Sequence, residues 1–332
     1  MRNNLRQTSI LFSIFIAVSL QALRQTNAAG NSIESKFATV DGIRIRYLIA
    51  GHGPAIILLH GYTQTSRMWR PLIPKLTDKF AVIAPDLPGI GESEIPKDGL
   101  DMKTAAIRIH ALAKSLGITK ARVVGHDIGL MVAYAYAAQF PVEVEKLVVM
   151  DALLPGVPGW ELAYDNPDFW HFRFHGPTPE ALVQGREKIY FAYFWNDLAA
   201  DKEHSLPEPD RASYVAACAR PGRIRAGWAY FASWPDTAKD FAQMAQHQLT
   251  MPVLSIAGDK ASAALLGPQM KRVATDVKVI ELKGYCRAGS CSIHPDTDGD
   301  GGRPLENGRP RALSRRQDDS SKHRHLGPGR DG

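Results

Sequence analysis

The sequence predicts an α/β protein with a mostly parallel sheet and an inserted helical segment. Short apolar segments alternate with amphipathic helical segments over residues 55–151 and again over 252–282, as buried parallel strands do with the helices that connect them. Between them, over 152–248, the alternation stops and the sequence becomes aromatic and helical with Pro-rich joints. A chain of 332 residues that is 45% hydrophobic can bury one large core and carry such an insertion.

The individual elements follow in order along the chain. Two extended segments joined by Asp41-Gly42, a dipeptide that favours tight turns, predict an antiparallel hairpin. Beyond the hairpin, continuous apolar runs predict buried strands, and amphipathic stretches predict helices. The expected strands are 36–40, 43–50, 55–59, 80–84, 122–124, 146–150, 252–257 and 277–282, and the expected helices are 66–76, 102–116 and 265–273.

The first 29 residues have the layout of a secretory signal peptide. Two arginines precede an apolar run over 10–20, and small residues follow around Ala28 and Ala29. The apolar run is too short to span a bilayer comfortably, so we expect cleavage near Ala28 or Ala29 and no integral membrane span afterwards. The signal predicts an exported protein, either periplasmic or secreted.

Charge and composition limit the partners and divide the chain. The formal net charge is +6, but no stretch interleaves basic with aromatic residues as nucleic-acid grooves do, so we expect no nucleic acid. The oligomeric state is not predicted. The composition shifts predict a signal peptide (1–29), a first core part (30–151), a helical cap (152–248), a second core part (249–284) and a disordered tail (285–332).

The strand expected at 122–124 runs into the pattern Gly-x-Asp-x-Gly, centred on Asp127, and a helix-forming stretch follows at once. In such a strand-turn-helix segment the turn lifts the central side chain over the edge of the sheet, and the glycines let the backbone pass closely. Aspartate at this position predicts a carboxylate nucleophile and an alkyl-ester intermediate. The other interpretation of Asp127 is a helix N-cap.

Three motifs, His-Gly-Tyr-Thr-Gln-Thr over 60–65, Asp-Leu-Pro-Gly-Ile-Gly-Glu-Ser over 86–93 and the turn around Asp127, together resemble the α/β-hydrolase family. Within it they are similar to the epoxide hydrolase and haloalkane dehalogenase branch, and most of all to secreted bacterial epoxide hydrolases of the Cif type. The resemblance runs from about residue 36 to residue 284. It implies the α/β-hydrolase fold with an inserted helical cap, and neither a cofactor nor a metal.

The resemblance implies roles for residues of the core. The backbone amides of Tyr62 and Ile128 would form an oxyanion hole, because two fixed donors stabilise the charge that ester hydrolysis places on one oxygen. Asp151, which follows the strand at 146–150, would orient the catalytic histidine. A helix cap is the other interpretation of Asp151, and Asp259 is the second candidate for the acid.

The resemblance also implies an acid in the cap, because the oxygen of an opening epoxide must receive a proton or a hydrogen bond. His171 matches the cap histidine of the family, and Tyr230 is the candidate for its cap tyrosine. A shift of one residue in register would place Phe231 there instead. Packing in a core is the plainer interpretation of both residues.

The predicted function is therefore hydrolysis of a small apolar epoxide to a diol. One alternative is a haloalkane dehalogenase, which would use the same Asp127. The neighbours of Asp127 argue against haloacids, since Leu130 and Met131 carry no charge for a substrate carboxylate, and against haloalkanes, since Ile128 supplies no aromatic ring for a halide.

The family places a catalytic histidine just after the last strand, commonly in a Gly-His-Trp string, and then a final helix. After Gly284 this sequence has Tyr-Cys-Arg-Ala-Gly-Ser-Cys, so both are missing at that place. A frameshift just after Gly284, real or in the sequence record, would explain both absences. His294 is the nearest substitute, beyond the expected position and beside Pro295. A second alternative is therefore a catalytically impaired binding or effector protein on the same fold.

Overall fold

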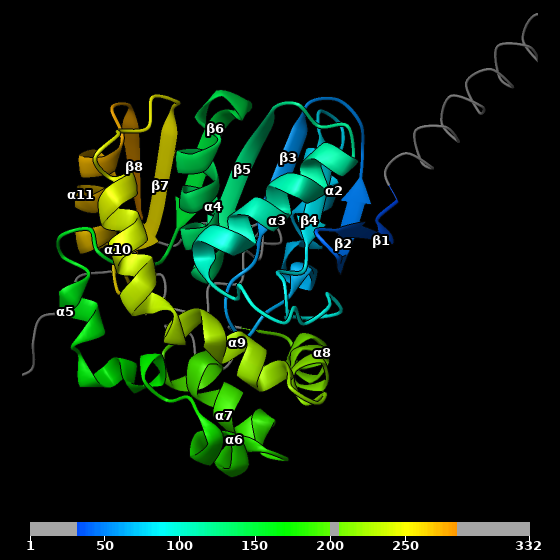
Figure 1. The fold of residues 1–332 in the computed structure, drawn as a ribbon, viewed down its shortest axis with the longest axis vertical. Helices are drawn as coiled ribbons and strands as arrows, with labels where there is room; N and C mark the ends of the chain where they lie inside the picture. Colours follow the sequence, from blue (N-terminus) through cyan, green and yellow to red (C-terminus); the bar gives the residue numbers. More distant parts are fainter. Residues whose placement is uncertain (1–31, 200–205, 284–332) are drawn as a thin grey trace, which may run out of the picture. The chain divides into compact units, whose positions relative to one another are not determined.

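The computed structural model describes residues 32–199 and 206–283 (Figure 1). The predicted signal peptide over 1–29 lies outside these residues. So does the segment 285–332, with His294, for which we predicted disorder and no final helix. None of the described helices is both long enough and apolar enough to span a membrane.

The described strands form one sheet of eight in the order β1-β2-β4-β3-β5-β6-β7-β8. Strand β2 is antiparallel to β1 and to β4, and all other neighbours are parallel, as the apolar runs predicted. The strands are β1 (Glu34–Val40), β2 (Ile43–Ala50), β3 (Ala55–Leu59), β4 (Ala81–Pro85), β5 (Ala121–His126), β6 (Val144–Met150), β7 (Val253–Gly258) and β8 (Val277–Leu282).

The turn between β1 and β2 forms as predicted. Val40 pairs with Ile43, so the loop has two residues, and Asp41 and Gly42 have φ angles of 47° and 76°. Two successive positive φ angles match the right-handed twist of the flanking strands, and Asp-Gly adopts them at low cost.

Helices cover both faces of the sheet. On one face, α3 (Met102–Ser115) packs against α4 (Ile128–Gln139), α4 packs against β5 and β6, and α11 (Ala263–Val273) packs against β7. Helix α10 (Trp234–Met244) also packs against α3 and α4, although its residues fall in the range predicted for the cap. On the other face, Trp69 and Ile73 pack with buried residues of β2, β3 and β4.

The continuous helix predicted over 66–76 is wrong. The chain forms a short 3-10 helix, η1 (Ser66–Trp69), and a single turn, α2 (Ile73–Leu76). Pro71 and Pro74 explain the difference, because neither can donate the backbone hydrogen bond that a continuous helix needs at its position.

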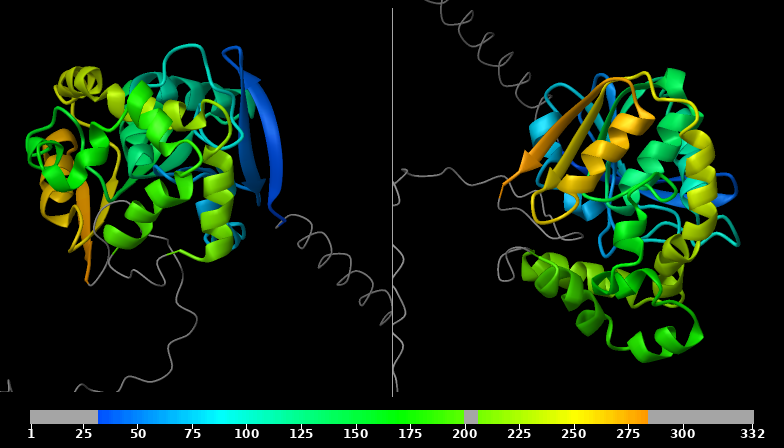
Figure 2. Two further views of the ribbon diagram at one scale, coloured as in Figure 1. Left: turned by 90° about the horizontal axis from the view of Figure 1, so that it is seen from below. Right: turned by 90° about the vertical axis from the view of Figure 1, so that its left-hand side faces the viewer.

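The inserted segment folds into short helices beyond the carboxyl ends of the parallel strands (Figures 1 and 2). Their many aromatic side chains stack edge to face, which fills the space between helices too short to be stable alone. The cap helices are α5 (Glu161–Tyr164), η3 (Pro167–Phe172), α6 (Pro177–Val183), α7 (Glu187–Ala192), η4 (Tyr193–Asp197), α8 (Glu208–Cys218) and α9 (Arg223–Ala232).

Candidate active site

Asp127 lies between the end of β5 and the start of α4 in a strained conformation. Its φ and ψ angles are 52° and −124°, which a residue with a side chain adopts only under constraint. The glycines of the motif permit the turn. A Cβ atom on Gly129 would lie 2.5 Å from the carbonyl oxygens of Leu59 and His60, and one on Gly125 would strike the carbonyl of Gly129. The turn predicted from Gly-x-Asp-x-Gly is therefore present.

Two backbone amides act on the carboxylate of Asp127. The amide of Tyr62 donates to Asp127 Oδ2 at 2.8 Å, and the amide of Ile128 lowers the pKa of the same carboxyl. These are the two amides that the sequence analysis assigned to an oxyanion hole.

The environment of Asp127 disfavours the charged form of its carboxyl group. The pKa of Asp127 is raised to about 7, mainly by burial and in part by the nearby charge of Asp151, while the amides of Tyr62 and Ile128 act in the opposite direction. A carboxyl with a pKa near 7 is ionised in about half of the molecules at neutral pH. In this dry site the carboxylate is less well solvated than in water, which favours its reaction as a nucleophile.

The loop that carries the Tyr62 amide is held at two places. The ring of His60 bonds through Nδ1 to the carbonyl of Gly61 at 2.8 Å, and its Nε2 accepts from the amide of Leu87 at 3.0 Å. The hydroxyl of Tyr62 bonds to that of Tyr190 at 3.0 Å, and Trp228 Nε1 donates to Tyr190 at 2.9 Å. The sequence analysis did not find Tyr190 or Trp228, because only folding brings α7 and α9 over Tyr62.

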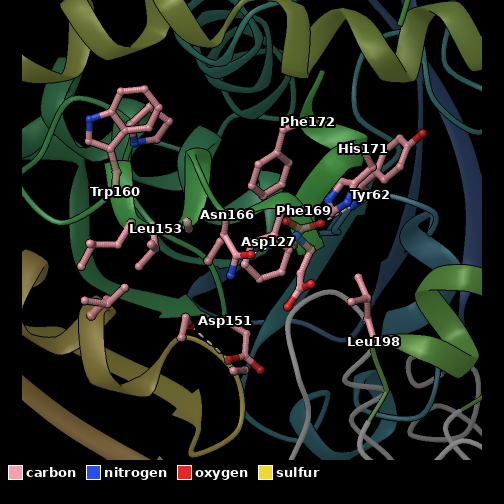
Figure 3. A pocket seen from close by; sticks show the side chains of 18 of the residues that line it. Tyr62, Asp127, Asp151, Leu153, Trp160, Asn166, Phe169, His171, Phe172 and Leu198 are labelled. Atoms are coloured by element: carbon pink, nitrogen blue, oxygen red, sulfur yellow. Dashed lines mark hydrogen bonds between the residues drawn. The ribbon is translucent and has the colours of Figure 1, made fainter. Parts of the chain in front are cut away.

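Asp151 lies at the neighbouring strand end, directly after β6, with a positive φ of 55°. Its Oδ1 accepts from the amide of Gly258 at 3.1 Å and from the hydroxyl of Ser262 at 3.2 Å. Asp127 and Asp151 line the same cavity (Figure 3). Asp259, the second candidate for the acid, lies in the wall of this cavity as well.

His171, in η3, faces the cavity from the cap side (Figure 3). The rings of Phe172, Phe194 and Phe231 surround it at centroid distances of 4.4, 4.8 and 5.7 Å. Burial lowers the pKa of His171 to about 3, so its imidazole is neutral at physiological pH. Its Nδ1 has no hydrogen-bond partner among the described residues. A neutral imidazole can still donate one hydrogen bond into the cavity.

The structure does not bring Tyr230 into the cavity. Its side chain is fully buried elsewhere, and its hydroxyl donates to the carbonyl of Pro88 at 2.9 Å. Phe231, the alternative in register, lines the cavity instead. Side chains of successive residues in a helix point about 100° apart. A shift of one position in register therefore decides whether Tyr230 or Phe231 faces the cavity.

The cavity between core and cap has a volume of about 380 Å³. Its wall is mainly aromatic and aliphatic, while Asn166 (Figure 3) adds a neutral polar group and Asp168 and Lys260 add charged ones. In the sequence, the Asn-Pro pair at 166–167 indicates only the start of a turn or helix. It does not indicate that the Asn166 side chain lines a cavity. The apolar wall includes Leu153, Trp160, Phe169, Phe172, Phe194, Leu198, Phe231 and Trp234.

A protein-family model described as the α/β hydrolase fold matches residues 54–268 of this chain. The match covers more than half of the sequence and includes both strand ends that carry the acids. The chain therefore belongs to the α/β-hydrolase family, as its three motifs predicted.

Relatives narrow the assignment to the epoxide hydrolase branch of this family. The chain is 35% identical over 228 residues to the soluble epoxide hydrolase of Corynebacterium sp. (strain C12), covering 67% of this chain and 79% of that relative. It is 32% identical over 259 residues to epoxide hydrolase 4 of Mus musculus, covering 74% of this chain and 69% of the relative.

Solved structures agree with these relatives. The epoxide hydrolase CorEH without ligand superposes with a TM-score of 0.69 and 31% identity, over 77% of this chain and 92% of that chain. Cfl2 from Burkholderia cenocepacia superposes with a TM-score of 0.71 and 32% identity, over 77% of this chain and 90% of that chain. The protein is a hydrolase of the epoxide hydrolase type.

Proposed function

We propose that this protein opens small apolar epoxides through an ester of Asp127. One oxygen of the Asp127 carboxylate attacks a ring carbon and forms a new C–O bond. The C–O bond between that carbon and the ring oxygen breaks, and the ring oxygen leaves as an alkoxide that takes up a proton. The product of this half-reaction is a hydroxyalkyl ester of Asp127.

The observation that carries this proposal is the position of Asp127, strained, partly buried and bound by the Tyr62 amide in the wall of a mainly apolar cavity. The aromatic wall suits the apolar part of an epoxide, because binding there removes apolar surface from water. The constraint on the backbone also directs the carboxylate before any substrate arrives, so little reorganisation is needed.

His171 would donate a hydrogen bond to the developing alkoxide from the cap side. Its neutral form fits this role because a charged imidazolium would be expensive among three phenylalanine rings. Tyr230 would have no direct role, because its hydroxyl is already bonded to Pro88.

The second half-reaction needs a water molecule to attack the ester carbonyl, with a base to take its proton. The amides of Tyr62 and Ile128 would hold the resulting oxyanion. Asp151 would orient the base if it is a histidine. Of the histidines in 32–199 and 206–283, only His171 lines this cavity. We therefore expect the first half-reaction from the described residues, and completion only if a group outside 32–199 and 206–283 supplies the base.

Intact mass after incubation with a panel of epoxides tests the proposal. We expect the mass to increase by that of one whole epoxide, and no increase in Asp127→Asn. Asp151→Asn should still form the adduct, since Asp151 serves only the second step. His171→Phe should slow adduct formation about 100-fold, within the usual range for loss of an acid, while the matched His175→Phe, at an exposed position of the cap, leaves it unchanged.

Absence of both an adduct and diol product across the panel would refute the epoxide proposal and favour the catalytically impaired binding protein. Full turnover to diol would support the proposal and show that a base is present. The same incubation with haloalkanes tests the dehalogenase alternative through release of halide.

A further inference from the structure

A second cleft lies between the core and cap helix α8, away from the cavity of Asp127. It has a volume of about 330 Å³ and shares no lining residue with that cavity. Its core wall comes from β2, η1 and the loop after β4, and its cap wall from α8 and the residue that follows soon after it. The lining consists of Arg46, Thr65, Arg67, Arg70, Asp86, Gly91, Glu92, Ser213, Ala216, Ala217 and Arg220.

Four arginines from three segments far apart in sequence face this cleft, which is an unusual concentration of one charge. Three of them have partners. Arg46 bonds to Ser35 and Ser66 and lies 3.5 Å from Asp86 Oδ1. Arg67 pairs with Asp210, and Arg220 donates to the carbonyl of Gly91, which ties the cap to the core.

The two acidic side chains that line the cleft already have partners. Asp86 is buried, and its carboxylate accepts from the amides of Ser66 at 2.8 Å and Glu92 at 2.9 Å. The Glu92 carboxylate lies 3.6 Å from Arg46 Nε, with its side chain 57% exposed. Neither acid is paired with Arg70.

The backbone amide of Arg70 donates to the carbonyl of Arg67, but its guanidinium has no hydrogen-bond or ion-pair partner within the part of the chain that the structure describes. Partial burial lowers the pKa of its guanidinium, and the charges of Arg46 and Arg67 lower it further. The carboxylate of Asp210 acts in the opposite direction, but it is already paired with Arg67. The guanidinium of Arg70 stays charged, so the four arginines leave the cleft with an excess of positive charge over Asp86, Glu92 and Asp210.

We propose that this cleft binds a small molecule through a phosphate group. Arg70 from the core and Arg220 from the cap would hold the phosphate oxygens from opposite walls, and the hydroxyls of Thr65 and Ser213 can donate to them as well. Guanidinium groups bind phosphate through two parallel hydrogen bonds, stronger than those between neutral groups. A phosphate held in this way would connect η1 to the end of α8.

Isothermal titration of the full-length protein tests the proposal, with inorganic phosphate, pyrophosphate and phenyl phosphate as probes at constant ionic strength. We expect binding of inorganic phosphate and tighter binding of pyrophosphate. Arg70→Ala should weaken both about tenfold, which corresponds to about 1.4 kcal/mol. Arg272→Ala, which removes an exposed arginine of α11, is the matched control and should leave both affinities unchanged.

Arg70→Lys keeps the charge but loses the paired donors, so its affinity should fall between those of the wild type and Arg70→Ala. Circular dichroism establishes that each variant is folded. Binding of phenyl phosphate would identify a phosphate ester as the ligand, and binding of the two inorganic probes alone would identify an inorganic phosphate. No heat of binding from any probe at tens of millimolar, or equal weakening by Arg70→Ala and Arg272→Ala, would overturn the proposal.

Discussion

The carboxylate of Asp127 costs the folded protein free energy in two ways. Its backbone lies in a region that costs about 1–3 kcal/mol for a residue with a side chain. Its charge is partly buried, and the amides of Tyr62 and Ile128 offset only part of the loss of hydration, which is why its pKa reaches about 7. The same features give a nucleophile that is partly desolvated and fixed in direction. Because the buried charge destabilises the folded state, we expect a neutral replacement of this side chain to stabilise the fold.

Asp127→Asn should stabilise the protein in a pH-dependent manner. The pKa of Asp127 is about 7 in the folded state and near 4 in the unfolded chain, so the folded state binds more protons between these values. The stability that the protonated carboxyl contributes is fully present below about pH 4 and is lost as the pH rises to 7. Asparagine keeps an oxygen for the Tyr62 amide and carries no charge.

Urea unfolding measures this effect. We expect Asp127→Asn to be more stable than wild type by about 2–4 kcal/mol at pH 8, and this advantage to shrink by about 2 kcal/mol at pH 5. Asp276→Asn, at an exposed position, is the control and should show no such trend. An advantage that does not change with pH would contradict the raised pKa.

The elements that meet at the site were largely predictable, because their signals are local. A continuous apolar run marks a buried strand, and Gly-x-Asp-x-Gly marks the turn from β5 into α4. The helix expected over 66–76 failed for a local reason as well, since two prolines divide it. The predicted ends of strands and helices differ from the observed ends by one to a few residues. This is expected, because hydrogen bonds to neighbouring segments decide where an element ends.

At the scale of the turn, Gly129→Ala should disrupt the site and the fold together. The new Cβ would lie 2.5 Å from the carbonyl oxygens of Leu59 and His60, so α4 would have to move away from β3. We expect a loss of about 3 kcal/mol or more in urea unfolding, and loss of the Asp127 adduct.

Gly117→Ala is the matched control. Gly117 has a positive φ of 74°, but a Cβ there would meet nothing within 4 Å. We expect a cost of about 1 kcal/mol from the backbone conformation alone, with adduct formation unchanged. Equal effects of the two substitutions would show that close packing of the turn is not what Gly129 provides.

On the scale of the whole molecule, helix α9 fastens the cap to the loop that follows β4. Arg223 donates to the carbonyls of Gly89, at 3.2 Å, and Ser93, and the hydroxyl of Tyr230 donates to the carbonyl of Pro88. These bonds hold the cap over the cavity. Tyr230 therefore contributes to the site through the position of the cap rather than through chemistry.

Arg223→Met should weaken this attachment while preserving the length of the side chain. Loss of charged hydrogen bonds to buried carbonyls should cost about 1–3 kcal/mol in thermal or urea unfolding. The cap should also become more sensitive to limited proteolysis, with slower formation of the Asp127 adduct.

Arg225→Met, two residues along the same helix, is the control. Arg225 is exposed and pairs with Glu180 within the cap, so its loss should change neither stability nor proteolysis measurably. If the two variants behave alike, the bonds from Arg223 to the core do not hold the cap.

The sequence by itself determined the family, the order of strands and helices along the chain, and the place of Asp127 at a turn between a strand and a helix. These features depend on periodicity and on short motifs, whose physical causes act within a few residues. Placement of Asp151 at the neighbouring strand end also followed, because parallel strands end at the same edge of a sheet.

Only the tertiary structure decided which side chains share a cavity. It put Phe231 rather than Tyr230 beside His171, joined Tyr62 to Tyr190, and gathered arginines from β2, η1 and α8 around one cleft. It also decided the raised pKa of Asp127, since burial is a property of all the neighbours together. Such contacts join residues up to more than 100 positions apart, and no local pattern encodes the packing that brings them together.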